Sequence, residues 1–192
     1  MAYISKDIFL NYIDCPKRGW LILREKSDGF ITELSPAERL RMEEGREIGE
    51  RARNLYRQGK LVDEKNVEKA AELTKLLISN PAVTTIFEAT FKSSLMAAKA
   101  DILKRDGHNW HLIEVKSGKE ATPEYIADIA YTMTVLRLAG LPIARASLMG
   151  VSGDYRLGMT DEALFSYFDV TAKASEISDS FASECPNICR TL

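Results

Sequence analysis

The strongest constraint on the fold lies in the middle of the chain, where short apolar runs replace the helical periodicity of the preceding residues. Thr84–Phe91, Leu95–Lys104 and Trp110–Ser117 each have the length and apolar content of a strand. A polar turn over residues 105–109, with Asp106-Gly107 as its strongest signal, separates the last two runs. The three runs therefore predict a meander of adjacent antiparallel strands.

Helical patterns flank this meander on both sides. Ser5 begins a predicted short helix, Ser35-Pro36 begins a second that stops at Gly59, and Gly140 ends a long one. The strand predicted at 144–151 is expected to join the sheet beside Trp110–Ser117 through the long crossover helix. The sequence thus predicts an α/β fold, a central mixed sheet flanked by helices, in one domain over residues 1–192. The predicted helices cover 5–13, 35–58, 67–79 and 123–140, a further strand covers 165–170, and 171–192 is assigned to a helix and a tail.

The composition is that of an ordinary globular protein. A net charge of −2 over 192 residues argues against a protein that coats nucleic acid through a global positive field, although a local basic strip stays open. The N-terminus lacks the apolar core of a signal peptide, and no apolar run is long enough to span a bilayer. We therefore expect a cytoplasmic protein with no membrane partner.

Three ionisable residues stand within the predicted strands. Glu114 and Lys116 are two apart and project from one face, and pairing through the short turn brings Asp101 to the same end of the sheet. Such a cluster is costly to bury unless its charges are paired or bind a metal, and carboxylates suit Mg²⁺ or Mn²⁺. A metal there would activate water and clamp a phosphate oxygen, while Lys116 would orient that water or offset transition-state charge. The alternative is a solvated ion pair on an exposed strand face.

The order of these segments resembles the PD-(D/E)XK nuclease superfamily. AKADIL, a turn and WHLIEVKS are similar to its core, in which a strand aspartate precedes an E-x-K strand. IFEATF, YIADIAYTMTVLRLAGL and FLNYIDCPKRGWL resemble segments of its RecB-like branch, which includes CRISPR-associated exonucleases and uncharacterised bacterial nucleases. The resemblance covers about residues 5–150 and implies a restriction-endonuclease-like core.

The resemblance also implies roles for particular residues. Asp101 and Glu114 match the metal ligands, and Lys116 matches the catalytic lysine. Glu88 matches an acidic residue of the preceding strand, either a further metal ligand or a partner of one; the alternative is a charge at a strand edge. Tyr125, with Asp128 three residues later on the same helix face, would position Lys116 or a phosphate, or else belong to the surface and packing.

Two positions depart from the family pattern. Gly49 stands where RecB-like nucleases often place a metal-binding histidine, and Glu50, slightly favoured over Glu47, is the candidate acidic ligand in its place. A solvated helix face is the alternative for both acids. The later helix usually carries a glutamine ahead of a tyrosine, but here Tyr131 is followed by Thr132 and the glutamine is absent.

The three cysteines bear on a second cofactor. Some RecB-like nucleases hold an iron–sulfur cluster with one early and three late cysteines, and Cys15, Cys185 and Cys189 match part of that pattern. A four-thiolate cluster needs one more ligand. We therefore expect Cys15 to pack in the core as a free thiol, with the cluster as the less favoured alternative.

Basic residues near the expected site would hold the phosphates of a DNA strand. Trp20 would stack on a base or, in the favoured interpretation, pack in the core. The candidate nucleic-acid contacts are Lys17, Arg18, Arg51, Arg53, Lys92 and Lys119.

The sequence therefore predicts a Mg²⁺- or Mn²⁺-dependent deoxyribonuclease, with exonuclease favoured over endonuclease. Its expected substrates are single-stranded DNA or duplex ends, and its expected setting is DNA repair, recombination or CRISPR-type defence. A nuclease or helicase complex is the candidate partner. The departures at Gly49 and Thr132 keep a second hypothesis open: a nuclease-fold module that binds nucleic acid or a partner protein without cutting.

Overall fold

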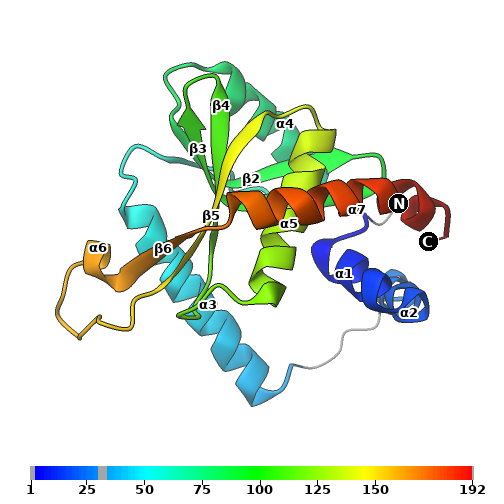
Figure 1. Ribbon diagram of the computed structural model, residues 1–192, viewed down its shortest axis with the longest axis horizontal. Helices are drawn as coiled ribbons and strands as arrows, with labels where there is room; N and C mark the ends of the chain where they lie inside the picture. The colour runs from blue at the N-terminus through cyan, green and yellow to red at the C-terminus, as the bar shows by residue number, and fades with distance from the viewer. Residues whose placement is uncertain (1–2, 30–33, 192) are drawn as a thin grey trace.

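A mixed sheet runs through the computed structural model, which describes residues 3–29 and 34–191 (Figure 1). Within these residues the strands are β1 (Lys60–Leu61), β2 (Thr85–Ser93), β3 (Met96–Asp106), β4 (Asn109–Val115), β5 (Ile143–Val151) and β6 (Phe165–Asp169). They lie side by side in chain order. β2, β3 and β4 are antiparallel neighbours, β5 is parallel to β4, and β6 is antiparallel to β5.

The predicted meander, the parallel fourth strand and the α/β class are confirmed. β1 was not predicted, because two residues are too few to show a period.

Helices cover both faces of this sheet. Their bounds are α1 (Lys6–Asp14), α2 (Pro16–Ser27), α3 (Pro36–Asn54), α4 (Val67–Ser79), α5 (Pro123–Leu138), α6 (Asp161–Leu164) and α7 (Thr171–Thr191). α5 provides the crossover between β4 and β5, and Gly140 follows its end with a φ of +85°, as expected for a helix stop. Where a helix was predicted with a tail at 171–192, α7 runs to Thr191, and residue 192 lies outside the described residues. No helix in the described ranges is long and apolar enough to cross a membrane.

The N-cap hydrogen bond expected from the sequence forms at α3 but not at α1. Ser35 accepts a hydrogen bond from the Glu38 backbone N–H, and the Glu38 carboxylate accepts one from the Ser35 N–H, which completes a capping box for α3. Ser5 occupies the N-cap position of α1, but its hydroxyl makes no capping hydrogen bond. The predicted boundary is therefore correct, while the predicted reason for it is not.

Three sequence predictions about the N-terminal third are wrong. Pro16 begins α2 where a loop was expected, because proline fits the first turn of a helix as well as it ends a preceding one. Trp20 on that helix is 38% exposed and lies under Arg24, with 4.8 Å between the guanidinium carbon and the ring centroid, so it is not a core residue. α3 ends at Asn54 and not at Gln58. Gly59 serves packing instead, since a Cβ there would come within 2.3 Å of the Phe87 ring.

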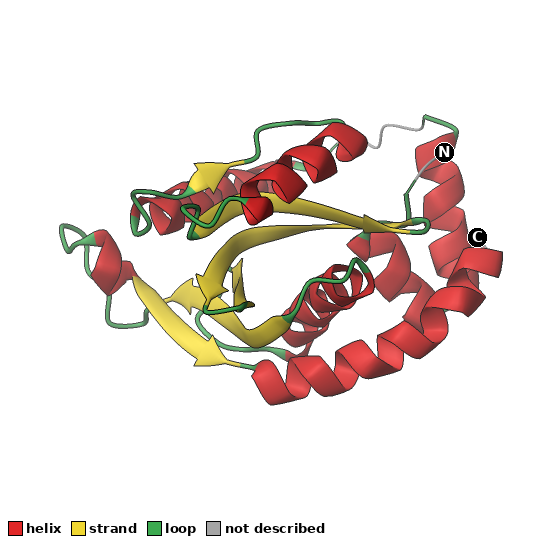
Figure 2. Cartoon of the chain, turned by 90° about the horizontal axis from the view of Figure 1, so that it is seen from above, coloured by secondary structure: helices red, strands yellow, loops and turns green. Residues whose placement is uncertain are grey.

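Two apolar cores lie on opposite faces of the sheet. The larger core packs α1, α4, α5 and α7 against the sheet and contains Phe9, Ile86, Leu103 and Ile129. In the smaller core, Ala52 near the end of α3 meets Ile102 and other sheet residues. Figure 2 shows the long C-terminal helix α7 on one side of the strands and α3, which follows the grey segment, on the other. The end of α3 is thereby held against the sheet, close to Asp101.

Side chains along a regular strand alternate between the two faces of the sheet. Both β2 and β3 break this alternation at one pair of opposed residues, Glu88 and Asp101. Ile86 and Ala89, three apart on β2, both belong to the larger core. On β3, Ala100 and Leu103 are also three apart, and both belong to the larger core. The pairs on either side, Phe87 with Ile102 and Ala89 with Ala100, keep one register, so Glu88 falls opposite Asp101. Glu88 has a φ of +54°, a strained conformation for a residue with a side chain.

Tyr131 ties the start of the chain to the sheet. Its hydroxyl is buried and donates to the carbonyl oxygens of Ile4, at 2.6 Å, and Ala97, at 3.0 Å. Its ring packs on Phe9 of α1, with 5.0 Å between the centroids. Since Ile4 pairs with Met96 of β3 and α1 begins two residues later, this contact fixes where that helix starts relative to β3.

We predict that Tyr131→Phe lowers the free energy of unfolding by about 1–3 kcal/mol, because two buried carbonyl oxygens lose their shared donor. Urea unfolding monitored by circular dichroism measures this change. Tyr167→Phe is the matched control, because its hydroxyl contacts only Tyr56 among the described residues and its side chain is half exposed. Equal destabilisation by the two variants would contradict the role given to Tyr131.

Candidate active site

The three central residues predicted from the sequence converge. Asp101 lies on β3, Glu114 lies near the end of β4, and Lys116 directly follows β4. A carboxylate oxygen of Asp101 accepts a hydrogen bond of 2.7 Å from the backbone N–H of Val115, between the other two residues. The Lys116 Nζ lies 3.2 Å from Glu114 Oε1. The expected convergence is confirmed, and the interpretation as a solvated strand pair does not hold for Glu114, whose side chain is only 4% exposed.

α5 holds Lys116 in place. Its Nζ lies 2.5 Å from Asp128 Oδ2 and 5.3 Å from the centre of the Tyr125 ring. Burial alone would lower the pKa of Lys116, but the charges of Glu114 and Asp128 and the hydrogen bond to Asp128 outweigh burial and raise it. Lys116 therefore stays protonated, which suits a hydrogen-bond donor and a fixed positive charge but not a general base.

Lys6 of α1 joins the cluster, although the sequence gave no signal for it. Its Nζ lies 2.7 Å from Glu114 Oε1 and 3.5 Å from Asp128 Oδ2. Burial would lower the pKa of Lys6, but the charge of Glu114 together with Asp128 raises it, despite the opposing charge of Lys116. Two ammonium groups and two carboxylates thus share one small volume. A lysine so far from β4 in sequence is brought there only by the packing of α1.

The donor set fits a hard divalent cation. Burial, followed by the nearby charge of Glu114, raises the pKa of Asp101 well above the ordinary range of an aspartate. Glu114 Oε2 is buried without a hydrogen-bond partner among the described residues. Asp101 therefore carries a disfavoured negative charge, and one oxygen of Glu114 has no hydrogen-bond donor although lysines meet the other. Mg²⁺ is commonly held by only one or two carboxylates, with water and substrate oxygens completing its shell, so Asp101 and Glu114 suffice as protein ligands.

Glu88 also lies at this site, but its ion pairs are longer than those of Glu114. Its carboxylate oxygens lie 3.7 Å from an Arg53 nitrogen and 3.8 Å from Lys99 Nζ, and its side chain is 31% exposed. It borders the same cavities as Asp101 and Glu114. The structure thus brings Glu88 to the site, and its role as a further metal ligand stays a prediction.

A cavity of about 310 Å³ opens over the carboxylates. Besides Asp101, Glu114 and Lys116, it is bordered by Gly45, Arg46, Gly49 and Arg53 of α3. Glu50 is exposed and does not line the cavity, and Glu47 is exposed as well, so the acidic replacement for a histidine is not brought to the site. The reason is helical geometry: Glu50 lies one residue, or about 100°, further round α3 than Gly49.

The predicted nucleic-acid contacts are scattered. Arg53 is the one that lines the cavity over the carboxylates. Arg51 is bound to Asp161 at 2.8 Å and to the Tyr155 hydroxyl, and Lys92 is bound to Glu68. Lys17 and Arg18 are exposed on α2, where a loop was expected, and Lys119 is exposed in the loop after β4.

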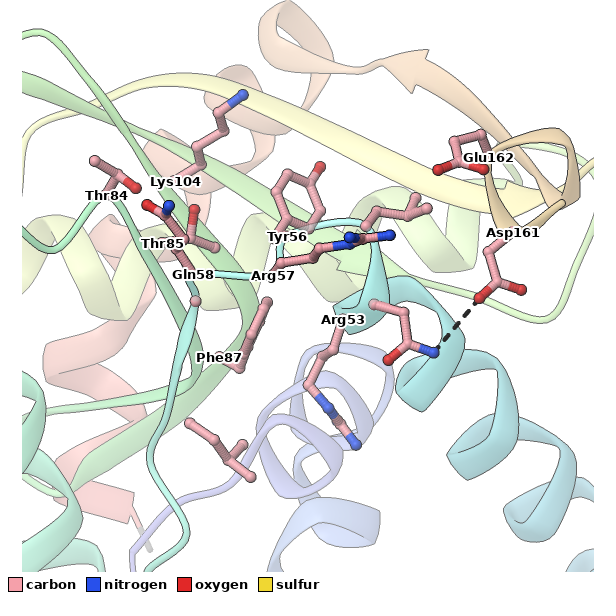
Figure 3. A pocket seen from close by; sticks show the side chains of 14 residues that line it. Arg53, Tyr56, Arg57, Gln58, Thr84, Thr85, Phe87, Lys104, Asp161 and Glu162 are labelled. Carbon is pink, nitrogen blue, oxygen red and sulfur yellow. Dashed lines mark hydrogen bonds between the residues drawn. The ribbon is translucent and has the colours of Figure 1, made fainter.

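A larger pocket of about 980 Å³ adjoins the site through Arg53 (Figure 3). Arg57, Tyr56 and Lys104 lie around it, with the Lys104 Nζ 5.8 Å from the centre of the Tyr56 ring. Sequence reasoning missed Lys104, because a lysine near the end of a strand has no distinguishing pattern. The pocket combines three basic side chains and an aromatic face with two acidic residues, Asp161 and Glu162, beside the candidate active site.

The cysteines do not form a shared ligand set. Cys15 is exposed, Cys185 is buried and Cys189 is partly buried. In the described part of the chain, no three His, Cys, Asp or Glu side chains gather closely enough to hold a metal by themselves. The expectation that Cys15 packs in the core is wrong, because Pro16 starts a new helix at the surface and leaves Cys15 at the junction.

Comparisons with known proteins find likeness only in structure. The fold is similar to that of the alkaline exonuclease LHK-Exo from Laribacter hongkongensis, with a TM-score of 0.49 and 12% identity over 98% of this chain and 90% of that one. It is similar to LHK-Exo in complex with dAMP at the same TM-score and identity, over 97% and 87% of the two chains. The sequence matches no protein-family model and no curated protein. A likeness this distant assigns no activity to this chain.

We predict that Lys116 reacts with acetic anhydride at least ~10-fold more slowly than Lys17, because one unit of pKa changes the reactive neutral fraction about tenfold. Asp128→Asn should accelerate labelling of Lys116 several-fold, since it removes one of the charges that raise the lysine's pKa. Mass spectrometry of the labelled peptides measures both rates. Asp179→Asn is the control, because within residues 3–29 and 34–191 this exposed aspartate pairs only with Arg137. Labelling of Lys116 as fast as Lys17 would contradict the buried network.

Proposed function

We propose that this protein is a metal-dependent nuclease that hydrolyses phosphodiester bonds in DNA, with Asp101, Glu114 and Lys116 at its catalytic centre. The observation that carries the proposal is a pair of carboxylates, Glu114 buried and Asp101 partly buried, beside a fixed ammonium. Glu114 Oε2 has no partner in the described residues, the pKa of Asp101 is raised, and Lys116 is held at 2.5 Å by Asp128. Such an arrangement is unfavourable for stability alone, and strongly perturbed groups in a cavity mark functional sites.

The residues divide the chemistry among them. Asp101 and Glu114 would hold Mg²⁺ or Mn²⁺, which when bound polarises a phosphoryl oxygen and lowers the pKa of water. Lys116 is protonated and fixed, so it can donate to a phosphate oxygen or to the attacking water as negative charge develops. Asp128 and Tyr125 position Lys116 without contacting the reacting atoms. Lys6 offsets the charge of Glu114 and fixes its orientation.

The finer aspects of the proposal rest on the resemblance of the ordered segments to RecB-like nucleases. These aspects are exonuclease activity on single strands or duplex ends and a setting in repair, recombination or defence. One observation favours the second candidate, a module that binds without cutting: both Lys6 and Lys116 already contact Glu114 Oε1. In that case the lysines alone would neutralise the carboxylate, and divalent metal would not bind.

We predict that Asp101→Asn abolishes both DNA cleavage and metal binding without harming the fold. The amide removes a charge that burial and Glu114 disfavour, so the metal-free variant should melt at the same temperature as the wild type or higher. Mn²⁺ should raise the melting temperature of the wild type but not that of the variant. Cleavage of linear, circular, single- and double-stranded DNA with Mg²⁺, Mn²⁺ or EDTA measures activity.

Lys116→Met separates chemistry from metal binding in the same assays. It should keep the Mn²⁺-induced rise in melting temperature and lose activity by at least ~100-fold, as expected when a donor to developing charge is removed. Lys75→Met, an exposed lysine of α4, is the control and should be fully active. A wild-type protein that neither binds divalent metal nor cuts any substrate would favour the binding module and reject the nuclease.

The pocket in Figure 3 should hold the DNA backbone next to the site, because Arg53 borders both cavities and the basic residues Arg53, Arg57 and Lys104 outnumber the acidic ones, Asp161 and Glu162. Asp161 is in addition paired with Arg51. We predict that Arg57→Glu with Lys104→Glu weakens DNA binding at least ~10-fold and reduces the slope of log Kd against log salt by about 2. Lys173→Glu on α7, which packs against the opposite face of the sheet, should leave both quantities unchanged. Fluorescence anisotropy at several salt concentrations measures them.

A further inference from the structure

Lys6 carries a positive charge at a position that its own helix does not favour. It is the first residue of α1, and the N-terminal end of a helix favours negative charge over positive. The side chain turns onto Glu114 instead, with 2.7 Å between Lys6 Nζ and Glu114 Oε1. The buried carboxylate, and not the helix, therefore explains where the ammonium lies.

The charges around Glu114 balance without a further cation. Glu114 and Asp128 carry two negative charges. Lys6 and Lys116 carry two positive ones, and each ammonium lies within 3.5 Å of both carboxylates. A divalent cation at Glu114 would add two positive charges, of which Asp101 can offset one. Like charges repel strongly at such distances in a partly buried site, so one ammonium has to leave when the cation arrives.

The contacts identify Lys6 as the ammonium that leaves. Lys116 lies closer to Asp128, at 2.5 Å against 3.5 Å for Lys6, and the centre of the Tyr125 ring lies 5.3 Å from its Nζ. The side chain of Lys6 is 32% exposed and that of Lys116 is 16% exposed. Lys6 also borders a cavity of about 670 Å³ beside the start of α1, which gives its ammonium room to move.

We propose that Lys6 competes with the divalent cation for Glu114 and thereby sets the metal concentration at which the active site fills. The inference rests on the proposed function and adds to it a residue that controls metal loading. Before the metal binds, the ammonium compensates the buried carboxylate. When the metal binds, the ammonium turns away from Glu114 into the cavity beside α1, while Lys116 stays on Asp128.

Removal of the Lys6 charge should strengthen metal binding even though it weakens the fold. We expect Lys6→Met to bind Mn²⁺ at least ~10-fold more tightly than the wild type in isothermal titration of the full chain without DNA, because the competing charge is gone. Its melting temperature in EDTA should fall, because Glu114 loses its closest ion-pair partner. A purely structural role of Lys6 would lower both quantities together.

Two further variants separate the charge of Lys6 from general effects. Lys6→Arg keeps a positive charge at the same place and should bind Mn²⁺ no more tightly than the wild type. Lys26→Met is the matched control and should bind Mn²⁺ like the wild type. It also removes a lysine charge next to α1, because Lys26 pairs at 2.9 Å with Asp7, the neighbour of Lys6 in the chain.

A measurement on the wild type does not depend on the folding of any variant. Acetic anhydride should label Lys6 at least ~5-fold faster in Mn²⁺ than in EDTA, because the lysine loses the carboxylate that stabilises its charged, unreactive form. Lys17, which is exposed on α2, is the internal reference and should react equally fast in both. Mass spectrometry of the labelled peptides gives both rates.

Two outcomes would overturn the inference. One is a Mn²⁺ affinity of Lys6→Met equal to or below that of the wild type, and the other is labelling of Lys6 that Mn²⁺ leaves unchanged. In both cases metal-dependent cleavage that is lost in Asp101→Asn would leave the proposed nuclease intact. Tighter Mn²⁺ binding by Lys6→Met without cleavage of any DNA would keep the inference and reject the nuclease, whereas no Mn²⁺ binding by either protein would reject both.

Discussion

The burial of the Glu114 carboxylate is the constraint on which the rest of the site depends. A carboxylate that is almost inaccessible to water is unfavourable unless charge and hydrogen bonds compensate it. Lys116 supplies one compensating charge from the same strand end, and Lys6 supplies another from α1 at 2.7 Å. Asp128 then holds both lysines from α5. Three separate elements therefore meet at one carboxylate, and the position of each depends on the others.

The same network leaves some groups unsatisfied, and those groups are where function is expected. Only Oε1 of Glu114 meets the lysines, while Oε2 is buried without a partner in the described residues. Asp101 remains beside it with a raised pKa. Opposite Asp101, Glu88 holds a left-handed backbone conformation where two strands change faces. Backbone strain at Glu88 and the disfavoured charge of Asp101 therefore lie side by side. Such features lower the stability of a fold and are typical of functional sites.

Two cavities with different walls meet at the carboxylates of the candidate active site. The cavity under α3 adjoins the pocket of Figure 3 through Arg53, and that pocket carries three basic side chains and two acidic ones. A second cavity, beside the start of α1, shares Glu88, Asp101 and Glu114 with the cavity under α3 and has more apolar walls. The carboxylates therefore lie at the junction of two cavities that differ in polarity.

The sequence by itself determined the local structure and the centre of the site. Its caps and its periods of 2 and 3.6 residues predicted α4, the meander and α5 closely, and the spacing of Glu114 and Lys116 placed both on one face, because these features depend on neighbours along the chain. Only the tertiary structure decided which distant groups complete the site. It brought in Lys6, turned Glu50 away, exposed Cys15 and Trp20, and reversed the strand faces at Glu88. These outcomes depend on how each helix is rotated and packed against the sheet, and no local pattern encodes that rotation.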